Sequence, residues 1–386
     1  MSNNSIYYGR GTKEMFDDYM DFINYVFGFN GNSSDFKKLL PKLYKYDYEP
    51  AVNSYVAVED GKIKSAIGAF DHDISVCGNI IKTRGIGNVA VHPYARGNGY
   101  MKKLMNMALD DMVSDGVALS VLGGRRQRYN YFSYDKLGQT VYMSFNDDNF
   151  RHVFGSKRTH EVEFRRLNSS DIDIFSKIKQ LSESYPFYAL RDLEKYYDIL
   201  CSWEHKVYAG FSKGEFVGYA VVGSSTVYEM LVTDLDLIRA FVSALYDHLS
   251  KGALQIKIPV FLPDYIEKLY TLCESYSVDI CKSFSVLNYQ QVVKAFLELK
   301  KTYTELPDGS LVLEIDGRGG LEKIEISVIN GVPDVKSTEQ EADIVLEHLE
   351  AMNLIFAGMC PGRERLPLFA RVWFPLPIYL YNADAV

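Results

Sequence analysis

The sequence predicts a mixed α/β (α+β) fold built from several domains, and three observations point to it. Between Gly85 and Leu122 a strand-like apolar run passes through a glycine-rich loop into a helical pattern and a second apolar run, an order typical of α/β units. A hairpin pattern at residues 55–70 recurs at residues 206–222. The 386 residues exceed what one hydrophobic core usually organises, so we expect domains at 1–150, 151–290 and 291–386.

The first domain is expected to open with a helix from about Met15 to Phe29, where apolar residues recur at helical spacing. Tyr55–Val58 and Ile63–Phe70 flank Asp60-Gly61, a dipeptide typical of tight hairpin turns. The same sheet is expected to continue through Ile74–Thr83, Gly85–Val91 and Leu119–Leu122.

The loop Arg96-Gly-Asn-Gly99 is the most informative segment of the chain. Its glycines allow the backbone to bend tightly, and a helix follows at once. Several unpaired N–H groups then point one way at the positive end of the helix dipole, which makes an anion site that suits a pyrophosphate. The dinucleotide fingerprint and the P-loop motif are both absent here.

This loop resembles the acetyl-CoA pyrophosphate loop of the GCN5-related N-acetyltransferases, whose pattern is Arg/Gln-x-x-Gly-x-Gly/Ala. Met101 departs from the final small residue, which affects helix packing rather than the phosphate-binding N–H groups. A ligand-free strand-to-helix turn is the alternative, and the basic residues nearby argue against it. The resemblance implies that the pantetheine arm and pyrophosphate are held by Val89, Ala90, Val91, Arg96, Gly97, Asn98, Gly99, Tyr100, Met101 and Lys102.

Composition narrows the function classes. The net charge of −8 disfavours nonspecific nucleic-acid binding. No apolar run approaches the ~18 residues of a membrane span, and Met1–Ser5 lacks the features of a signal peptide. The five scattered cysteines show no Cys-x-x-Cys spacing, so we expect reduced thiols, a cytoplasmic protein and no metal site.

The second hairpin, Lys206–Phe211 and Glu215–Val222 around Gly214, repeats the layout of the first. Helical patterns at 169–181 and 191–200 precede it, and 234–249 takes the place of the cofactor helix without a glycine-rich loop before it. We interpret this region as a second copy of the same fold that lacks the phosphate cradle, with coincidence as the alternative.

The pattern of expected elements changes in residues 291–386. Leu311–Ile315 and Glu322–Val328 are expected as strands, Asp343–Phe356 as one helix and Leu366–Trp373 as another. These elements predict a small α+β domain.

The three regions together resemble the bacterial Eis-type (enhanced intracellular survival) acetyltransferases, which join tandem acetyltransferase domains to a sterol-carrier-like domain. Tyr129, Phe132 and Tyr134 keep that family's Tyr-x-x-Phe-x-Tyr spacing, although the family's glycines between them are replaced here. The resemblance implies Tyr129 as general acid and the α-carboxylate of Val386 as general base. It also places Gly124 and Arg125 near the cofactor, although the family carries an acidic residue at the Arg125 position.

The implied reaction is acetyl transfer from acetyl-CoA, as co-substrate, to a primary amine: an aminoglycoside-like compound, a polyamine or a lysine. The resemblance also suggests a homo-oligomer, as large as a hexamer. Amine acetylation needs a base for the ammonium, a hydrogen-bond donor for the thioester oxygen and a proton for the thiolate. A phenol with a pKa of ~10 carries such a proton at neutral pH, and the Val91 N–H is a candidate oxyanion donor.

Other interpretations compete with these assignments. His92 is an alternative base, and His72 within Asp-His-Asp suggests a turn more than a metal ligand. The run Arg125-Arg126-Gln-Arg128 suits either the 3′-phosphate of CoA or a solvated basic loop. At the level of the whole chain, a lipid- or ligand-binding protein using the C-terminal domain, or a cofactor-binding regulator without transfer activity, remains open.

Overall fold

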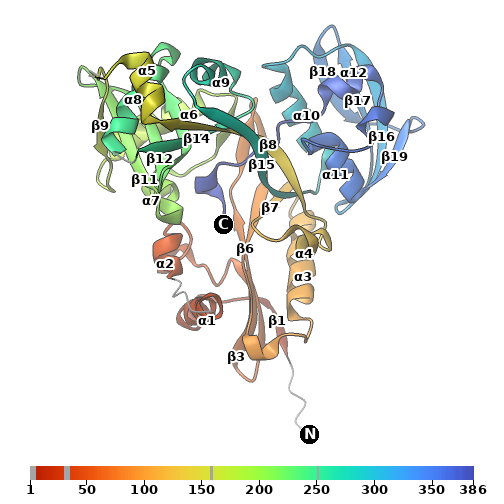
Figure 1. Cartoon of the computed structure of the whole chain (residues 1–386). Helices are drawn as coiled ribbons and strands as arrows, with labels where there is room; N and C mark the ends of the chain where they lie inside the picture. The colour runs from red at the N-terminus through yellow and green to blue at the C-terminus, as the bar shows by residue number, and fades with distance from the viewer. Residues whose placement is uncertain (1–5, 30–34, 157–159, 250–251) are drawn as a thin grey trace.

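The computed structural model describes residues 6–29, 35–156, 160–249 and 252–386. The expectation for Met1–Ser5 lies outside these residues. Figure 1 shows three lobes, and the C-terminus lies between the N-terminal lobe and the middle lobe rather than in the C-terminal lobe.

Twelve strands form one mixed sheet that runs through the first two lobes. In spatial order they are β1 (Tyr7–Arg10), β2 (Ser54–Glu59), β3 (Lys62–Asp71), β6 (Thr83–Val91), β7 (Leu119–Leu122), β15 (Ser275–Val286), β8 (Asp135–Asn146), β14 (Ala253–Pro259), β13 (Thr226–Val232), β12 (Glu215–Gly223), β11 (Lys206–Ser212) and β9 (Glu163–Arg166). Both predicted hairpins, β2–β3 and β11–β12, are confirmed with antiparallel registers.

The two halves of this sheet have the same strand order. In the first, β6 pairs in parallel with β7 and α3 (Tyr100–Ser114) connects them. In the second, β13 pairs in parallel with β14 and α8 (Ile238–Leu249) connects them. The halves also exchange strands, because β15 lies beside β7 and β8 lies beside β14. The sheet is therefore continuous across residue 150, and the division into domains at 1–150, 151–290 and 291–386 remains a prediction.

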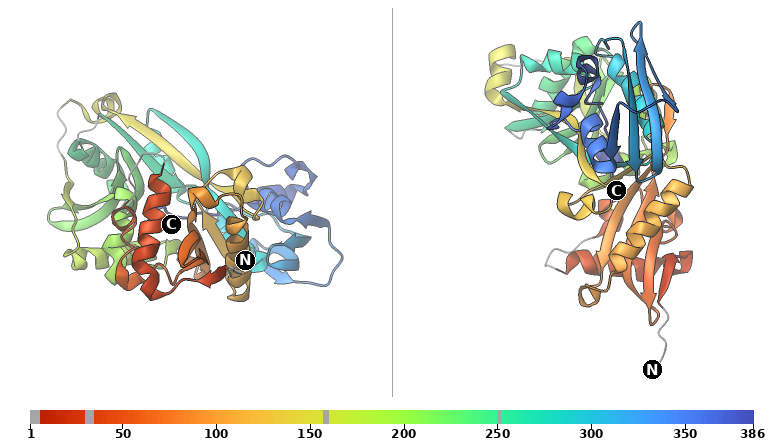
Figure 2. Two further views of the ribbon diagram at one scale, coloured as in Figure 1. Left: turned by 90° about the horizontal axis from the view of Figure 1, so that it is seen from below. Right: turned by 90° about the vertical axis from the view of Figure 1, so that its right-hand side faces the viewer.

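Helices cover both faces of the first half. Alternate strand residues point to opposite faces, so Ile67 and Ile86 pack with α3 while Ala66 and Ala90 pack with α1 (Phe16–Gly28). Figure 2 shows these two helices on either side of the sheet. The other helices of the first two lobes are α2 (Phe36–Leu39), α4 (Arg126–Asn130), α5 (Asp147–Phe154), α6 (Ile172–Glu183), α7 (Tyr196–Cys201) and α9 (Pro263–Tyr270).

The expectation that Ile74–Thr83 continues the main sheet is wrong for most of that segment. β4 (Ile74–Val76) and β5 (Asn79–Ile81) form a separate three-stranded sheet with β10 (Phe187–Ala189). Ile74 and Val76 are fully buried and belong to the same core cluster as Phe187. The partner strand lies more than a hundred residues away, which the local pattern could not reveal.

The C-terminal lobe has a four-stranded sheet and three helices. The strands in order are β18 (Val332–Ser337), β17 (Gly320–Ile329), β16 (Gly309–Gly317) and β19 (Ile344–Glu347), and the helices are α10 (Tyr289–Lys301), α11 (His348–Phe356) and α12 (Leu368–Trp373). The single helix expected over Asp343–Phe356 is wrong in its first turn, because Ile344–Glu347 pairs in parallel with β16. Its β-branched Ile344 and Val345 favour that strand.

Candidate active site

The glycine-rich loop leaves the N-terminus of α3 open. Gly97 and Gly99 have φ values of +91° and +77°, a region that favours glycine. Gly99 caps α3 without a side-chain hydrogen bond. Among the described residues, no acceptor is found for the backbone N–H groups of residues 96–102, and Lys103 is the first whose N–H bonds, to the Gly99 oxygen at 3.1 Å. These amides are therefore available to donate hydrogen bonds to an anion.

A β-bulge reshapes β6 just before this loop. The register with β3 shifts from Ala66↔Ala90 to Gly68↔Gly87, so β6 has one extra residue, and Asn88 has a φ of +48°. Such a bulge bends the strand and re-aims its side chains. The pairing of β6 with β7 ends at Ile86↔Leu122. Residues 87–91 therefore present backbone groups to the gap between the two strands.

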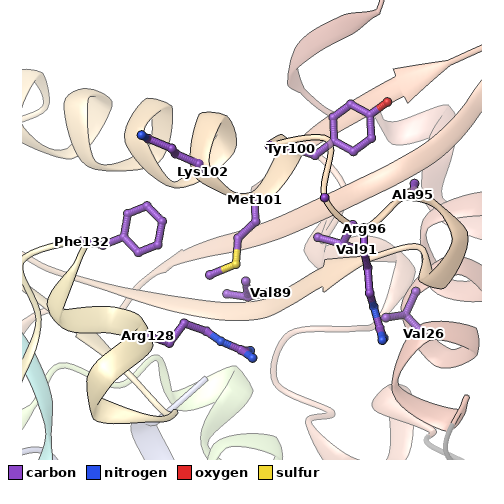
Figure 3. Close-up of a pocket in the computed structure, with 12 residues that line it drawn as sticks. Val26, Val89, Val91, Ala95, Arg96, Tyr100, Met101, Lys102, Arg128 and Phe132 are labelled. Carbon is purple, nitrogen blue, oxygen red and sulfur yellow. The ribbon is translucent and has the colours of Figure 1, made fainter.

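A cavity of about 700 Å³ lies over this loop and the bulged strand. Eight predicted cofactor-binding residues line it: Val89, Val91, Arg96, Gly97, Gly99, Tyr100, Met101 and Lys102. The sequence interpretation missed Val26 and Ala95 and gave Phe132 no binding role, and it considered Arg128 only as part of a basic run; all four also line the cavity. Figure 3 shows Met101 directed toward Val89, with Arg96 and Arg128 approaching from the two ends.

Four other predicted cofactor residues do not line this cavity. Ala90 is buried in the core on the α1 face, and Asn98 is exposed at the loop. Gly124 and Arg125 follow β7, and both are exposed. Arg126, from the same basic run, binds Asp135 through two hydrogen bonds of 2.5 and 2.8 Å.

Tyr129 lies at the end of the short helix α4, on the α3 face of the sheet. Its side chain is only 6% exposed, and a Cβ placed on Gly124 would lie 2.2 Å from its ring. Burial raises the pKa of its phenol above the ordinary value. Tyr129 is not among the described residues that line the large cavity, although Arg128 and Phe132 on either side of it are.

The C-terminal lobe fixes the loop that follows Tyr129. His348 Nε2 lies 3.0 Å from the Ser133 carbonyl, and the Arg318 N–H donates to His348 Nδ1 at 3.1 Å. These contacts fit the tautomer protonated on Nε2. Burial lowers the pKa of His348 to about 4, so this link is neutral at physiological pH.

Val386 lies against β6 at the edge of the bulge. A Cβ on Gly85 would lie 2.4 Å from Cγ2 of Val386, and a Cβ on Gly87 would lie 3.2 Å from its carboxyl carbon. The two glycines therefore provide the space for this residue. Val386 packs with the α1-side core, whereas Tyr129 belongs to the α3-side core, so the two residues lie on opposite faces of the sheet.

Two residues hold the backbone just before Val386. The buried Lys42 Nζ donates to the carbonyls of Ala383 and Ala385, at 2.5 and 2.8 Å. Trp203 Nε1 donates to the Ala385 carbonyl at 3.2 Å. Burial lowers the pKa of Lys42 to about 7. No Lys, Arg or His of the described ranges forms an ion pair with the Val386 carboxylate.

A buried ion-pair triad holds the same tail from the second lobe. Arg191 donates to Asp384 at 2.9 and 2.7 Å and to Glu229 at 2.7 and 2.7 Å. Tyr219 adds a hydrogen bond to Glu229 at 2.6 Å. Arg191, Asp384 and Glu229 are all buried. The sequence interpretation found no motif in the last five residues, and this triad joins positions about 40 to 190 residues apart.

Two smaller cavities, of about 330 and 310 Å³, meet at Val386. His72 lines the first and His205 lines the second. His72 Nε2 and His205 Nδ1 are buried without a hydrogen-bond partner among the described residues. Burial lowers the pKa of both histidines to about 4, so both rings are neutral at physiological pH.

The remaining sequence candidates take structural positions. His92 accepts a hydrogen bond from the Tyr94 N–H at 3.3 Å and stacks on Tyr25.

In the part of the chain that the structure describes, no group of three His, Cys, Asp or Glu residues is arranged to hold a metal ion. The five cysteines are free thiols. None of the helices in the described ranges has the length and apolar character needed to span a bilayer.

Comparison with known proteins agrees with this geometry. Residues 8–140 match the family model described as an acetyltransferase (GNAT) domain. A GCN5-related N-acetyltransferase from Anabaena variabilis has 15% identity and a TM-score of 0.69, with 98% of each chain covered. Eis1 from Mycobacterium abscessus has 12% identity and a TM-score of 0.62, also with 98% of each chain covered.

A probable N-acyltransferase from Enterococcus faecalis has 14% identity and a TM-score of 0.66, covering 90% of this chain and 89% of its own. No curated protein matches the sequence significantly. These structural likenesses establish the fold, and the family model establishes the domain that contains the loop and the bulged strand. Residues 8–140 thus form an acetyltransferase domain of the GNAT family, and the chain is an enzyme of the N-acetyltransferase class.

Proposed function

We propose that this protein transfers the acetyl group of acetyl-CoA directly to a primary amine, with Tyr129 as general acid and the Val386 carboxylate as general base. The position of Val386 supports this proposal most strongly. Its carboxyl carbon lies beside Gly87, at the start of the bulged segment that bounds the large cavity. A base at that point lies where an amine would meet an acyl group carried along β6.

The large cavity suits the coenzyme in shape and chemistry. The open amides of residues 96–102 and the guanidinium groups of Arg96 and Arg128 offer hydrogen bonds and positive charge to phosphates. Side chains at Gly97 and Gly99 would enter space that is free of protein atoms within 4 Å. When bound, the coenzyme supplies an acetyl thioester. The backbone at Val89 and Val91 would hold its pantetheine arm, and Val91 N–H would face the thioester oxygen.

The residues of this chain then provide the proton transfers. The Val386 carboxylate takes one proton from the substrate ammonium, so that the amine nitrogen can form a bond to the acetyl carbon as the carbon–sulfur bond breaks. The Tyr129 hydroxyl gives its proton to the departing sulfur. The second proton of the nitrogen restores the phenol, and the carboxyl group of Val386 releases its proton to water. One amide, one thiol and one free proton result.

The burial of Tyr129 supports its assigned role, because a raised pKa keeps the phenol protonated until the thiolate forms. Tyr129 and Val386 belong to opposite faces of the sheet. In this proposal the acyl group occupies the gap between β6 and β7, where each face has access to it.

We also propose a subfamily and an oligomeric state for this protein. The order of two matching half-sheets and a small α+β lobe suits an Eis-type enzyme with a sterol-carrier-like C-terminal domain, acting as a homo-oligomer. Light scattering would test the homo-oligomer, and a crystal structure of the complex with CoA would test the Eis-type architecture.

The direct test of function is release of free thiol from acetyl-CoA in the presence of amines. We expect thiol release that depends on the amine and produces the N-acetylated compound in equal amount. Binding of CoA without thiol release across a broad panel of amines would contradict the proposal.

A further inference from the structure

The smaller of the two cavities at Val386, here called the Trp203 cavity, has a distinct lining. It is lined by Trp203, His205, Tyr228 and Lys282, by the end of β7 and by the C-terminal tail. Its volume of about 310 Å³ is at the lower end of the roughly 300–1,000 Å³ found for small-molecule sites. The occupant must therefore be small.

Two polar groups of this cavity have unused hydrogen-bonding capacity. The Lys282 ammonium has three donors, and it makes one recorded hydrogen bond, to Asn382 Oδ1 at 2.8 Å. No carboxylate within the described ranges forms an ion pair with it. His205 is 5% exposed, and its Nδ1 has no partner there. Because unpaired polar groups are costly to bury, these atoms favour a polar ligand.

Three lysines lie near His205 of this cavity, and the carboxylates of Asp384 and Asp279 lie near those lysines. Burial lowers the pKa of His205, and the positive charges of Lys257, Lys282 and Lys42 lower it further. Lys257 Nζ lies 4.5 Å from the centre of the Tyr228 ring. The Val386 carboxylate is the one negative group among the described lining residues. A ligand with several positive charges would therefore meet repulsion.

The backbone at Trp203 is strained. Trp203 and Glu204 have φ values of +64° and +59°, which is rare for bulky residues. Such strain persists where the surroundings enforce it, often at binding sites. Here the strained Trp203 both lines the cavity and bonds to the tail at Ala385.

We infer that the acceptor is a small primary amine with an apolar or aromatic body and a carboxylate. This inference rests on the proposed acetyl transfer. The acceptor's amine would lie at Val386, its carboxylate at Lys282, and its body between Trp203 and Tyr228. This assignment narrows the acceptor to a zwitterionic amine and excludes polycations such as aminoglycosides and polyamines as preferred substrates.

The test compares matched substrates in the thiol-release assay. Phenylalanine and phenethylamine share a body and differ in the carboxylate, and spermidine serves as the polycation. For the wild type we expect kcat/KM to favour phenylalanine over phenethylamine by about tenfold or more, because one charge-assisted hydrogen bond is gained. Lys282→Gln should abolish that preference, and Lys282→Arg should keep most of it.

Lys213→Gln is the matched control, because Lys213 is exposed in a hairpin turn of the same lobe. It should retain the wild-type preference. A wild-type preference for phenethylamine or spermidine, with active transfer, would overturn the inference while acetyl transfer stands. If no amine supports thiol release, the proposed function itself is refuted. Calorimetric titration of phenylalanine into wild type and Lys282→Gln then still decides the carboxylate site, since equal affinities would overturn it.

Discussion

Substitution of Asp384 by Asn should separate the stability of the tail from its role in the reaction. Asp384 accepts two hydrogen bonds from the buried Arg191 guanidinium. A hydrogen bond to a charged group contributes about 1.5–3 kcal/mol. The asparagine keeps one acceptor oxygen, and Arg191 keeps its pair with Glu229, so no charge is left without a partner. We therefore expect the free energy of unfolding to fall by about 2–3 kcal/mol.

Glu229→Gln provides a closely matched control. Glu229 also accepts two hydrogen bonds from Arg191, and the substitution removes the same charge from the same triad. Urea unfolding should show similar losses for both variants. Only Asp384 belongs to the tail that ends at Val386, two residues later.

The two variants should differ in turnover. A displacement of about 1 Å in a reacting group costs up to roughly a hundredfold in rate, so Asp384→Asn should lower kcat in the thiol-release assay by more than about tenfold. Glu229→Gln should keep most of its turnover. Equal kcat values for the two variants, at equal loss of stability, would refute a positioning role for Asp384.

Three further predictions follow from the same structure. Gly99→Val should lower CoA affinity at least about tenfold in calorimetry, because its Cβ would occupy the phosphate space at a left-handed backbone position; Gly61→Val, with a similar φ in a distant hairpin turn, should not, and equal affinities would contradict the loop assignment. Tyr129→Phe should lower kcat at least about a hundredfold with CoA affinity unchanged, the lower range for losing a general acid; unchanged kcat would exclude Tyr129 as the acid. Stability should fall as the pH drops from 6.5 to 4, because three buried histidines bind protons in the unfolded chain at a higher pH than in the folded chain. Each contributes at most about 3 kcal/mol, and urea unfolding at pH 7 and 5 that gave equal stabilities would contradict the neutral state of His72, His205 and His348.

Local patterns predicted the local structure well. The turns at Asp60-Gly61 and at Gly214 lie where the sequence predicts them. Turn residues and strand alternation depend only on neighbouring residues, so the sequence alone reveals them. The glycine loop was identifiable for the same reason. Gly97 and Gly99 adopt the left-handed conformations that only glycine adopts readily.

Long-range pairing escaped the sequence interpretation. β15 lies between β7 and β8, although about 150 residues separate it from β7 and about 130 from β8 along the chain. Ile74–Val76 pairs with β10 rather than with the main sheet. The local sequence of such a strand does not specify which distant strand it pairs with.

The glycine-rich loop of the candidate site could be predicted because its features depend on the backbone of adjacent residues. Contacts between side chains of different lobes could not be predicted. Nothing near Lys42, Arg191 or Asp384 in the sequence marks them as partners of one tail. Their role comes from burial and charge pairing that only the folded chain creates. His348, which fixes the loop after Tyr129 from another lobe, was hidden for the same reason.

The proposed reaction depends most on a carboxylate at residue 386 acting beside the bulged strand. Its direct test is the thiol-release rate of a variant with three alanines added after Val386, compared with a variant that carries them at the N-terminus. We expect the C-terminal addition to lower kcat at least about a hundredfold, the lower range for losing a general base, with CoA affinity unchanged. A full rate in the C-terminally extended protein would show that the base lies elsewhere.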